Sequence, residues 1–205
     1  MRELDKAVGG LSRPSKMPGH AWSIPASECN VGSRLASVTG STCEGCYALK
    51  GRYNFPGTQN AMHRRLSIML SDPMAWAESM AAIISRKGEP EFRWHDSGDL
   101  QSSAHLDAIV RVAELTPTVQ HWLPTREYEL VKGREFPSNL CVRLSAHMVD
   151  GTAPDFGLAV STVTTQGEPI PDGAHRCPAP EQGNECGDCR ACWSPSVRHV
   201  DYIRH

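Results

Sequence analysis

Eight cysteines are the residues of this chain best suited to chemistry, and seven of them fall into two groups. The groups are Cys29, Cys43 and Cys46, and then Cys177, Cys186, Cys189 and Cys192. Cysteines that serve only as small core side chains would be scattered along the sequence. In a reducing compartment, grouped cysteines are typical of metal or redox chemistry rather than of structural disulfides. We therefore expect one or two metal centres, because the two groups either act separately or share one centre.

The first group has thirteen residues between Cys29 and Cys43 and two between Cys43 and Cys46. Gly45 allows a tight turn in which the last two cysteines converge. Two thiolates at this spacing bind a single metal ion or two irons of a cluster. Three protein thiolates leave one iron of a [4Fe–4S] cluster open to a small molecule. The alternatives are a structural zinc ion, or cysteines without a ligand in a Gly/Ser-rich loop.

The second group has gaps of eight, two and two residues between its cysteines. Two consecutive two-residue gaps resemble ferredoxin-type sequences, in which backbone turns present several sulfurs to one cluster. Zinc more often binds separated pairs of cysteines. The spacing favours an iron–sulfur cluster, with structural zinc as the alternative. Cys141 lies alone in an apolar segment and is expected to be a small buried side chain rather than a ligand.

Polar residues also follow several apolar segments directly, at the places where strands are expected to end. His95 and Asp96 come first, and Arg126, His147 and Ser161 follow three later segments. Because the carboxyl ends of parallel strands meet at one edge, these side chains are expected to share a ligand-binding rim. We expect His95, Asp96, Arg126 and His147 to face a substrate.

Ordinary structural roles remain open for these polar residues. Asp96 or Asp99 can cap the helix that follows, because Asp is a favourable N-cap residue. Arg126 and Glu127 can form an ion pair at a helix start. Gly98 permits a ligand to approach the backbone closely.

The elements that must position these residues alternate between short apolar segments and amphipathic ones. Helices are expected at about 58–70, from Asp72-Pro73 to Gly88, from Ser102 or Ser103 to just before Pro117, and at about 128–132. Strands are expected at 21–24, 91–94, 120–123, 140–144 and 158–160. Strands separated by helices favour a parallel sheet. The sequence therefore predicts an α/β fold, a partial (β/α) barrel of about five parallel strands.

The composition changes near residue 165, so we expect two parts of the chain. Residues 1–165 form the partial barrel with the N-terminal cysteine loop, and residues 166–205 form a cysteine-rich, metal-binding segment. The second part is dominated by Gly, Pro, Asp and Cys and shows little apolar periodicity. A segment of this kind cannot build its own core, so a bound metal is expected to order it.

The bulk properties indicate a globular protein and give no sign of a nucleic-acid or membrane partner, although a local basic patch remains open. The chain has 205 residues, a formal net charge of −2 and 40% hydrophobic residues. The chain has no excess of basic residues, so its net charge does not indicate nucleic-acid binding. No apolar run approaches the roughly 20 residues that cross a bilayer, and the N-terminus lacks the pattern of a secretory signal. We expect a cytoplasmic protein without a membrane partner.

Several segments resemble a family of phage and prophage proteins known as gene product 88. The resemblance lies in residues 43–53, with the sequence CEGCYALKGRY, and in residues 92–99, with the sequence FRWHDSGD. Residues 122–126, with the sequence WLPTR, and residues 186–193, with the sequence CGDCRACW, also fit the family. The resemblance implies a phage or prophage protein, located in the host cytoplasm if it is phage-encoded.

A more distant similarity suggests a chemistry. A cysteine followed by CxxCYA, after the first strand of an α/β protein, is similar to phage proteins of the radical S-adenosylmethionine (SAM) type related to spore photoproduct lyase. This similarity implies that Cys29, Cys43 and Cys46 hold a [4Fe–4S] cluster whose open iron chelates SAM. It also implies that Ser97, Gly98 and Asp99 contact the cofactor, and that the second cysteine group holds an auxiliary cluster.

Two classes of function follow from the sequence. The first is a radical SAM-like enzyme that takes electrons from a donor and acts on an unidentified substrate. The second is a non-enzymatic module in which iron–sulfur clusters or zinc only stabilise the fold, and which binds a host or phage macromolecule.

Overall fold

A computed structural model describes residues 2–204 of the chain. Within these residues, seven parallel strands form one open sheet in the order β1-β2-β3-β4-β5-β7-β6. The strands are β1 (His20–Trp22), β2 (Glu91–Trp94), β3 (Gln120–Thr125), β4 (Leu140–Ser145), β5 (Ala159–Thr164), β6 (His175–Arg176) and β7 (His199–Ile203). The predicted α/β class, with an open, barrel-like parallel sheet, is confirmed.

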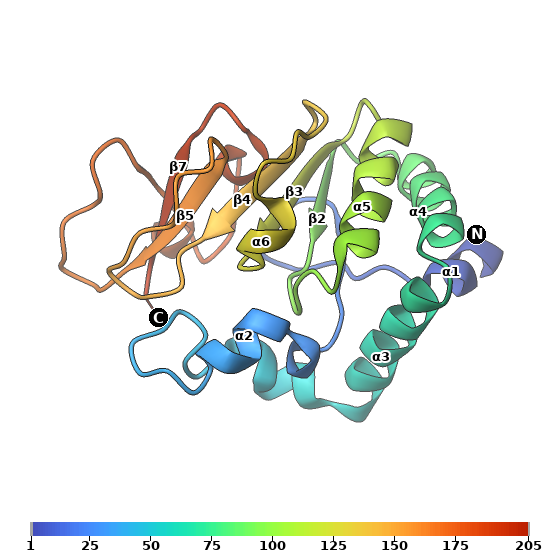
Figure 1. Ribbon diagram of the computed structural model, residues 1–205, viewed down its shortest axis with the longest axis horizontal. Helices are drawn as coiled ribbons and strands as arrows, with labels where there is room; N and C mark the ends of the chain where they lie inside the picture. The colour runs from blue at the N-terminus through green and yellow to red at the C-terminus, as the bar shows by residue number, and fades with distance from the viewer. Residues whose placement is uncertain (1, 205) are drawn as a thin grey trace.

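The helices lie mainly beside the first half of the sheet. They are α1 (Arg2–Val8), α2 (Asn30–Leu35), α3 (Pro56–Ser71), α4 (Pro73–Lys87), α5 (Ser103–Leu115) and α6 (Tyr128–Val131). Figure 1 shows α4 and α5 packed along one face of the sheet, and α2 and α3 beyond the arrowheads of the strands. None of the helices in residues 2–204 is long and apolar enough to cross a membrane.

Helices α4 and α5 begin or end with the capping interactions that the sequence predicts. The Asp72 carboxylate accepts a hydrogen bond of 3.0 Å from the Ala75 amide at the start of α4. Gly88 ends this helix with a φ of 66°, a conformation that favours glycine. Ser102, rather than Ser103, caps α5 by accepting a bond of 3.2 Å from the His105 amide.

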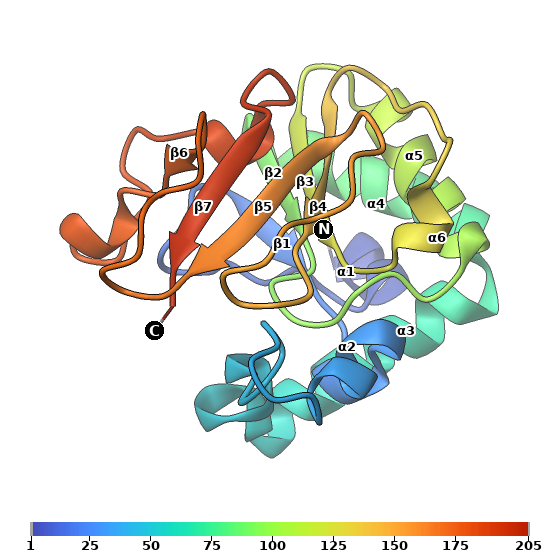
Figure 2. The ribbon, with the colours of Figure 1, turned by 60° about the vertical axis from the view of Figure 1, so that its left-hand side comes forward.

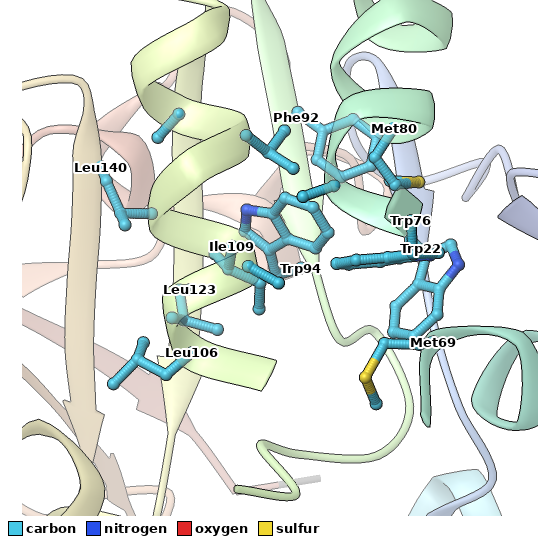
Figure 3. Close-up of a cluster of buried hydrophobic side chains, with 14 of the residues drawn as sticks. Trp22, Met69, Trp76, Met80, Phe92, Trp94, Leu106, Ile109, Leu123 and Leu140 are labelled. Atoms are coloured by element: carbon cyan, nitrogen blue, oxygen red, sulfur yellow. The ribbon is translucent and has the colours of Figure 1, made fainter. Parts of the chain in front are cut away.

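The main core lies between the sheet and helices α4 and α5, and aromatic side chains fill its centre (Figure 3). The rings of Trp22 and Trp76 have centroids 4.8 Å apart, and those of Phe92 and Trp94 are also 4.8 Å apart. All four side chains are at most 2% exposed. Large buried aromatic rings contribute much of the stability of a core, so this cluster fixes strands β1 and β2 against the helices.

The opposite face of the sheet is covered by the C-terminal part of the chain. Here Trp122 of β3 packs against Trp193, with ring centroids 5.1 Å apart. Ala191, Cys192 and Val200 complete this second apolar cluster. Figure 2 shows the C-terminal segment in orange and red, with its strands β7 and β6 at one edge of the sheet. The segment 166–205, expected to be irregular, therefore supplies two strands and a covering layer.

The sheet has two more strands than expected, and both, β6 and β7, lie in the segment after residue 165. β7 alternates polar His199 and Asp201 with apolar Val200 and Tyr202, but the Gly, Pro, Asp and Cys residues around it favour an irregular structure. Tertiary contacts stabilise the strand: the hydroxyl groups of Thr162 and Thr164 each donate a bond of 2.6 Å to the Asp201 carboxylate, which is 0% exposed.

The predicted ends of three strands differ from the structure. The first strand is β1, and not residues 21–24; the fifth extends to Thr164 rather than ending at residue 160. Pro124 lies within β3, paired with Arg143, rather than after the strand. β3 nevertheless continues to Thr125 because the residues on either side of Pro124 keep their strand pairing with β4.

Helices α1 and α2 were not predicted. For α2 the reason is a tertiary contact: the side chain of Glu127 accepts a hydrogen bond of 2.8 Å from the Val31 amide in the first turn. A free amide at a helix start needs an acceptor. Here the acceptor lies 96 residues away, so the local sequence of a Gly/Ser-rich loop does not reveal the helix.

Candidate metal centres

The first cysteine group lies in a loop that covers the carboxyl ends of the strands (Figure 1). The Thr42 amide donates to the His147 carbonyl at 2.9 Å, and the Thr42 hydroxyl donates to the Ala146 carbonyl at 2.8 Å. Ser41 and Met148 form an isolated antiparallel bridge beside these contacts. The loop is thus attached to the chain that follows β4, at the rim where ligands bind in parallel α/β folds.

Cys29 and Cys43 lie on either side of Gly32. A side-chain carbon built on Gly32 would lie 3.5 Å from the Cys29 sulfur and 3.7 Å from the Cys43 sulfur. The two sulfurs are therefore neighbours, although thirteen residues separate them in the sequence. The Cys46 amide donates to the Cys43 carbonyl at 3.1 Å, in a turn that contains Gly45 with a φ of 65°. The expected turn between the last two cysteines is present.

The third member of the group is close to the first two, as the electrostatics show. Burial is the main reason why the pKa of the Cys29 thiol lies well above its ordinary value. Negative charge on Asp99, Cys43 and Cys46 raises this pKa further, and the nearby Arg126 guanidinium lowers it. Three thiols, one carboxyl group and one guanidinium thus share one neighbourhood at the rim.

The second cysteine group gathers near the covered face of the sheet. The Cys189 amide donates to the Cys186 carbonyl at 3.0 Å, in a turn like that of the first group. Burial raises the pKa of Cys186, and Cys177 and Cys189 raise it further. Burial also raises the pKa of Cys192 to about 12, with Cys177 among the smaller contributors. Each of the four thiols therefore lies within electrostatic range of at least one other cysteine of the second group.

All cysteines in the structure are free thiols. Within residues 2–204, no three His, Cys, Asp or Glu side chains converge closely enough to form a site for a single metal ion. In a [4Fe–4S] cluster each thiolate binds a different iron, so the sulfurs lie around a body larger than one ion. Two sets of free thiols, three and four in number, are donors of the type that such clusters require.

His95 lies in the core rather than on an open surface. Its ring centroid is 6.1 Å from that of Trp22 and 5.2 Å from that of His105, and the residue is 4% exposed. Among the described residues, neither ring nitrogen has a hydrogen-bond partner. Burial holds the pKa of His95 well below its ordinary value. The ring is therefore neutral, and its contact with a substrate stays a prediction.

Asp96 binds the segment that follows the first cysteine group. Its carboxylate accepts hydrogen bonds from the hydroxyl groups of Ser23 and Tyr53, the latter at 2.9 Å. Its backbone carbonyl accepts one of 2.6 Å from the Tyr47 hydroxyl. Sequence reasoning missed both tyrosines, although Tyr47 directly follows Cys46. Because Ser102 caps α5, the helix-capping alternative for Asp96 is wrong.

Asp99 is also occupied by contacts within the protein. Its carboxylate accepts bonds from the Leu100 amide at 2.7 Å, the Thr125 hydroxyl at 2.6 Å and the Arg126 amide at 2.9 Å. Burial nevertheless raises the pKa of Asp99. The carboxylate thus connects the ends of β2 and β3, and it does not cap α5.

Gly98 has a structural reason to be glycine. Its φ is 86°, and an added side-chain carbon would lie 2.2 Å from a side-chain carbon of Ile24 and 2.9 Å from the Ile24 carbonyl oxygen. The close approach expected at this position is therefore to Ile24, and not to a ligand. The neighbouring Ser97 accepts a backbone bond of 3.2 Å from the Ile24 amide, and its buried hydroxyl has no partner among residues 2–204.

Arg126 and His147 meet at the rim, as expected. The Arg126 side chain donates to the Thr42 hydroxyl at 3.1 Å, and its backbone carbonyl lies 3.1 Å from Nε2 of His147. The His147 ring stacks on Tyr128, with centroids 4.1 Å apart. In the described structure Arg126 is not paired with Glu127. Both side chains therefore border the first cysteine group.

Ser161 and Cys141 have contacts within the sheet. Ser161 donates a hydrogen bond of 3.3 Å to the Ser145 hydroxyl between β5 and β4. Cys141 is 1% exposed within β4, and its sulfur lies 3.5 Å from an Arg143 nitrogen. The expectation that Cys141 is a buried side chain is confirmed.

Comparison with known proteins gives one assignment. No curated protein and no solved structure matches the chain. The family described as Gene product 88 matches residues 3–195, which include both cysteine groups and the rim of the sheet. This chain belongs to the Gene product 88 family.

Proposed function

We propose that this protein binds two iron–sulfur clusters. Cys29, Cys43 and Cys46 hold one cluster at the rim of the sheet. The four cysteines of the second group hold the other near the covered face: Cys177, Cys186, Cys189 and Cys192. The observation that carries the proposal is that free thiols gather in two places: the Cys29 and Cys43 sulfurs both lie beside Gly32, and the C-terminal cysteines Cys186, Cys189 and Cys192 pack in one cluster.

The three-cysteine cluster is proposed to be the reactive one. With three protein ligands it keeps one iron open, and when bound it would supply the electron that cleaves SAM in a radical reaction. Arg126 supports this role, because its guanidinium lies near Cys29 and Cys43 and can attract the carboxylate of a bound cofactor. The reaction requires an external one-electron donor and a substrate with an abstractable hydrogen.

The test begins with metal analysis of protein purified without air. We expect iron and acid-labile sulfide in equal amounts, in quantities that match two clusters per chain. The variant Cys43→Ala/Cys46→Ala should lose about half of the iron, and Cys141→Ala should retain all of it. A colourless protein without iron and sulfide would refute the cluster proposal.

A second measurement separates the enzyme from a protein that only carries clusters. The reduced protein is incubated with SAM, and 5′-deoxyadenosine is quantified. We expect product from the unmodified chain and from Cys141→Ala, and none from Cys43→Ala/Cys46→Ala. Absence of product, together with an EPR spectrum that SAM leaves unchanged, would exclude the radical reaction while leaving the clusters in place.

One observation favours a second candidate, a binding module stabilised by metal. The C-terminal cysteines belong to the segment that covers the sheet, where Trp193 and Cys192 are nearly fully buried. A metal held there would order this segment whether or not the protein is an enzyme. One zinc ion per chain, bound without sulfide and lost with Cys186→Ala, is the result that this candidate predicts.

A further inference from the structure

Two arginines on the covered face of the sheet lack an acidic partner. Arg143 of β4 is 0% exposed, and Arg93 of β2 is partly buried. Across residues 2–204, neither guanidinium forms an ion pair with Asp or Glu. Burying a charge without an opposite charge is unfavourable. Among the described residues, neither positive charge on this face is therefore neutralised by an ion pair.

The contacts of Arg143 satisfy most of its donors but not its charge. Its guanidinium donates to the carbonyl of Val160 at 2.9 Å and to that of Ala191 at 3.0 Å. It also donates to the carbonyls of Ser194 at 3.2 Å and Val197 at 3.0 Å. Three of these carbonyls belong to the segment around the last cysteine. Carbonyl groups are neutral, so the positive charge remains.

Arg93 is likewise held by neutral groups. Its guanidinium stacks over the Trp122 ring at 4.4 Å from the centroid and donates to the Met17 sulfur at 2.8 Å. Its Nε has no hydrogen-bond partner in the described part of the chain. The Asp96 carboxylate acts on Arg93 at longer range and favours its charged form, but among the described residues its oxygens are hydrogen-bonded to Ser23 and Tyr53 and form no ion pair with Arg93.

Both arginines lie close to the second cysteine group. The Arg143 guanidinium donates to the carbonyl of Ala191, the residue before Cys192. Arg93 contacts Trp122 and Met17, which belong to the same apolar cluster as Cys186 and Cys192. The Cys192 sulfur also lies 3.1 Å from the Tyr202 hydroxyl, which can donate to a thiolate. Two guanidinium groups and one hydroxyl donor thus lie beside this cysteine group.

We propose that Arg93 and Arg143 are the counter-charges of an anionic metal–thiolate cluster on Cys177, Cys186, Cys189 and Cys192. This inference rests on the proposed function. A cluster held by four thiolates is an anion, and it gains one more negative charge when it accepts an electron. Positive neighbours stabilise the reduced form more than the oxidised form, so the two arginines raise the reduction potential of this cluster.

The test measures the midpoint potential of the second cluster alone. Full-length protein carrying Cys29→Ala, Cys43→Ala and Cys46→Ala retains only this cluster, and dithionite supplies the electron in an EPR-monitored titration. In this background we expect Arg93→Gln to shift the potential to more negative values. Arg93→Lys, which keeps the charge, should stay near the parent value.

A matched control removes a positive charge elsewhere. Arg111 on α5 pairs with Glu78 on the helical side of the sheet, so Arg111→Gln should leave the potential unchanged. Equal shifts in Arg93→Gln and Arg93→Lys, or no shift in either, would overturn the inference while the cluster itself stands. Absence of iron and sulfide from the parent protein would instead refute the proposed function and the inference with it.

Discussion

The two cysteine groups are attached to the same sheet in different ways. The first lies in a loop fixed to the rim by polar contacts, such as those of Thr42 with residues 146 and 147. The second belongs to a segment that packs Trp193 against the sheet and contributes β7 to it. A loop attached by hydrogen bonds can open without unfolding the sheet, whereas the second segment is part of the fold. The first region therefore suits reactivity, and the second suits stability.

The sharpest test of this comparison removes two cysteines from each group. Cys186→Ala/Cys189→Ala should lower the free energy of unfolding by roughly 5 kcal/mol, because loss of the proposed metal centre would free part of the covering layer. Cys43→Ala/Cys46→Ala should lower it by only about 1–2 kcal/mol. Urea denaturation of both variants, with Cys141→Ala as the control, measures the difference. Equal losses would contradict the division of roles.

The next largest effect is expected at Trp193. Its ring is buried against Trp122, and its Nε1 donates to the Phe92 carbonyl at 3.0 Å. Trp193→Ala should cost about 3–5 kcal/mol of unfolding free energy, because it leaves a cavity and an unpaired carbonyl. Phe55→Ala, which truncates an aromatic side chain that is 60% exposed, should change stability by less than about 0.5 kcal/mol. Similar midpoints for the two variants would show that the C-terminal layer is not part of the fold.

Acid should weaken the core that both regions share. Burial lowers the pKa of His105 and of His121 to about 3, from an ordinary value of 6.5. In this range the unfolded chain binds protons that the folded chain does not, so stability is complete above pH 6.5 and falls as the pH drops toward 3. At pH 5.5 each histidine should cost about 1.4 kcal/mol.

The measurement is the free energy of unfolding between pH 5.5 and 8. His121→Gln should show a shallower loss than the parent, because one of the buried histidines with a lowered pKa is gone, while His95 and His105 remain. His63→Gln replaces an exposed histidine and should follow the parent curve. Parallel curves for all three proteins would exclude His121 as a source of the acid sensitivity.

The smallest effect concerns the attachment of the first region. Tyr53→Phe removes the hydroxyl that donates to Asp96 and should cost about 1–2 kcal/mol. Hydrogen exchange should become faster in residues 47–55, whereas amides of β5 and β7 should be unaffected. Faster exchange in β7 as well would mean that the two regions open together.

The sequence was informative wherever a structural feature is local. Asp72, Gly88 and Ser102 carry capping signals, and the boundaries of α4 and α5 agree with them. Strand β2 is predicted without error because its apolar residues alternate with polar ones. The collection of polar residues at one rim follows from parallel strands, and Arg126 and His147 do lie there together.

Features that depend on distant contacts could not be predicted in this way. Gly98 is required by Ile24, 74 positions earlier, and His95 lies in the core although the residues that follow it are polar. Strand β7 is stabilised by threonines of β5 around a buried Asp201. In each case the partner that determines the structure is absent from the local sequence window.

The strand order of the sheet also affects how the chain folds during synthesis. β7 lies between β5 and β6, although it follows both in the sequence. Until a ribosome has released residues 199–203, β5 has an open edge and β6 has no strand to join. An exposed strand edge can pair with other chains. Completion of β7 is therefore the step that protects a nascent chain from aggregation.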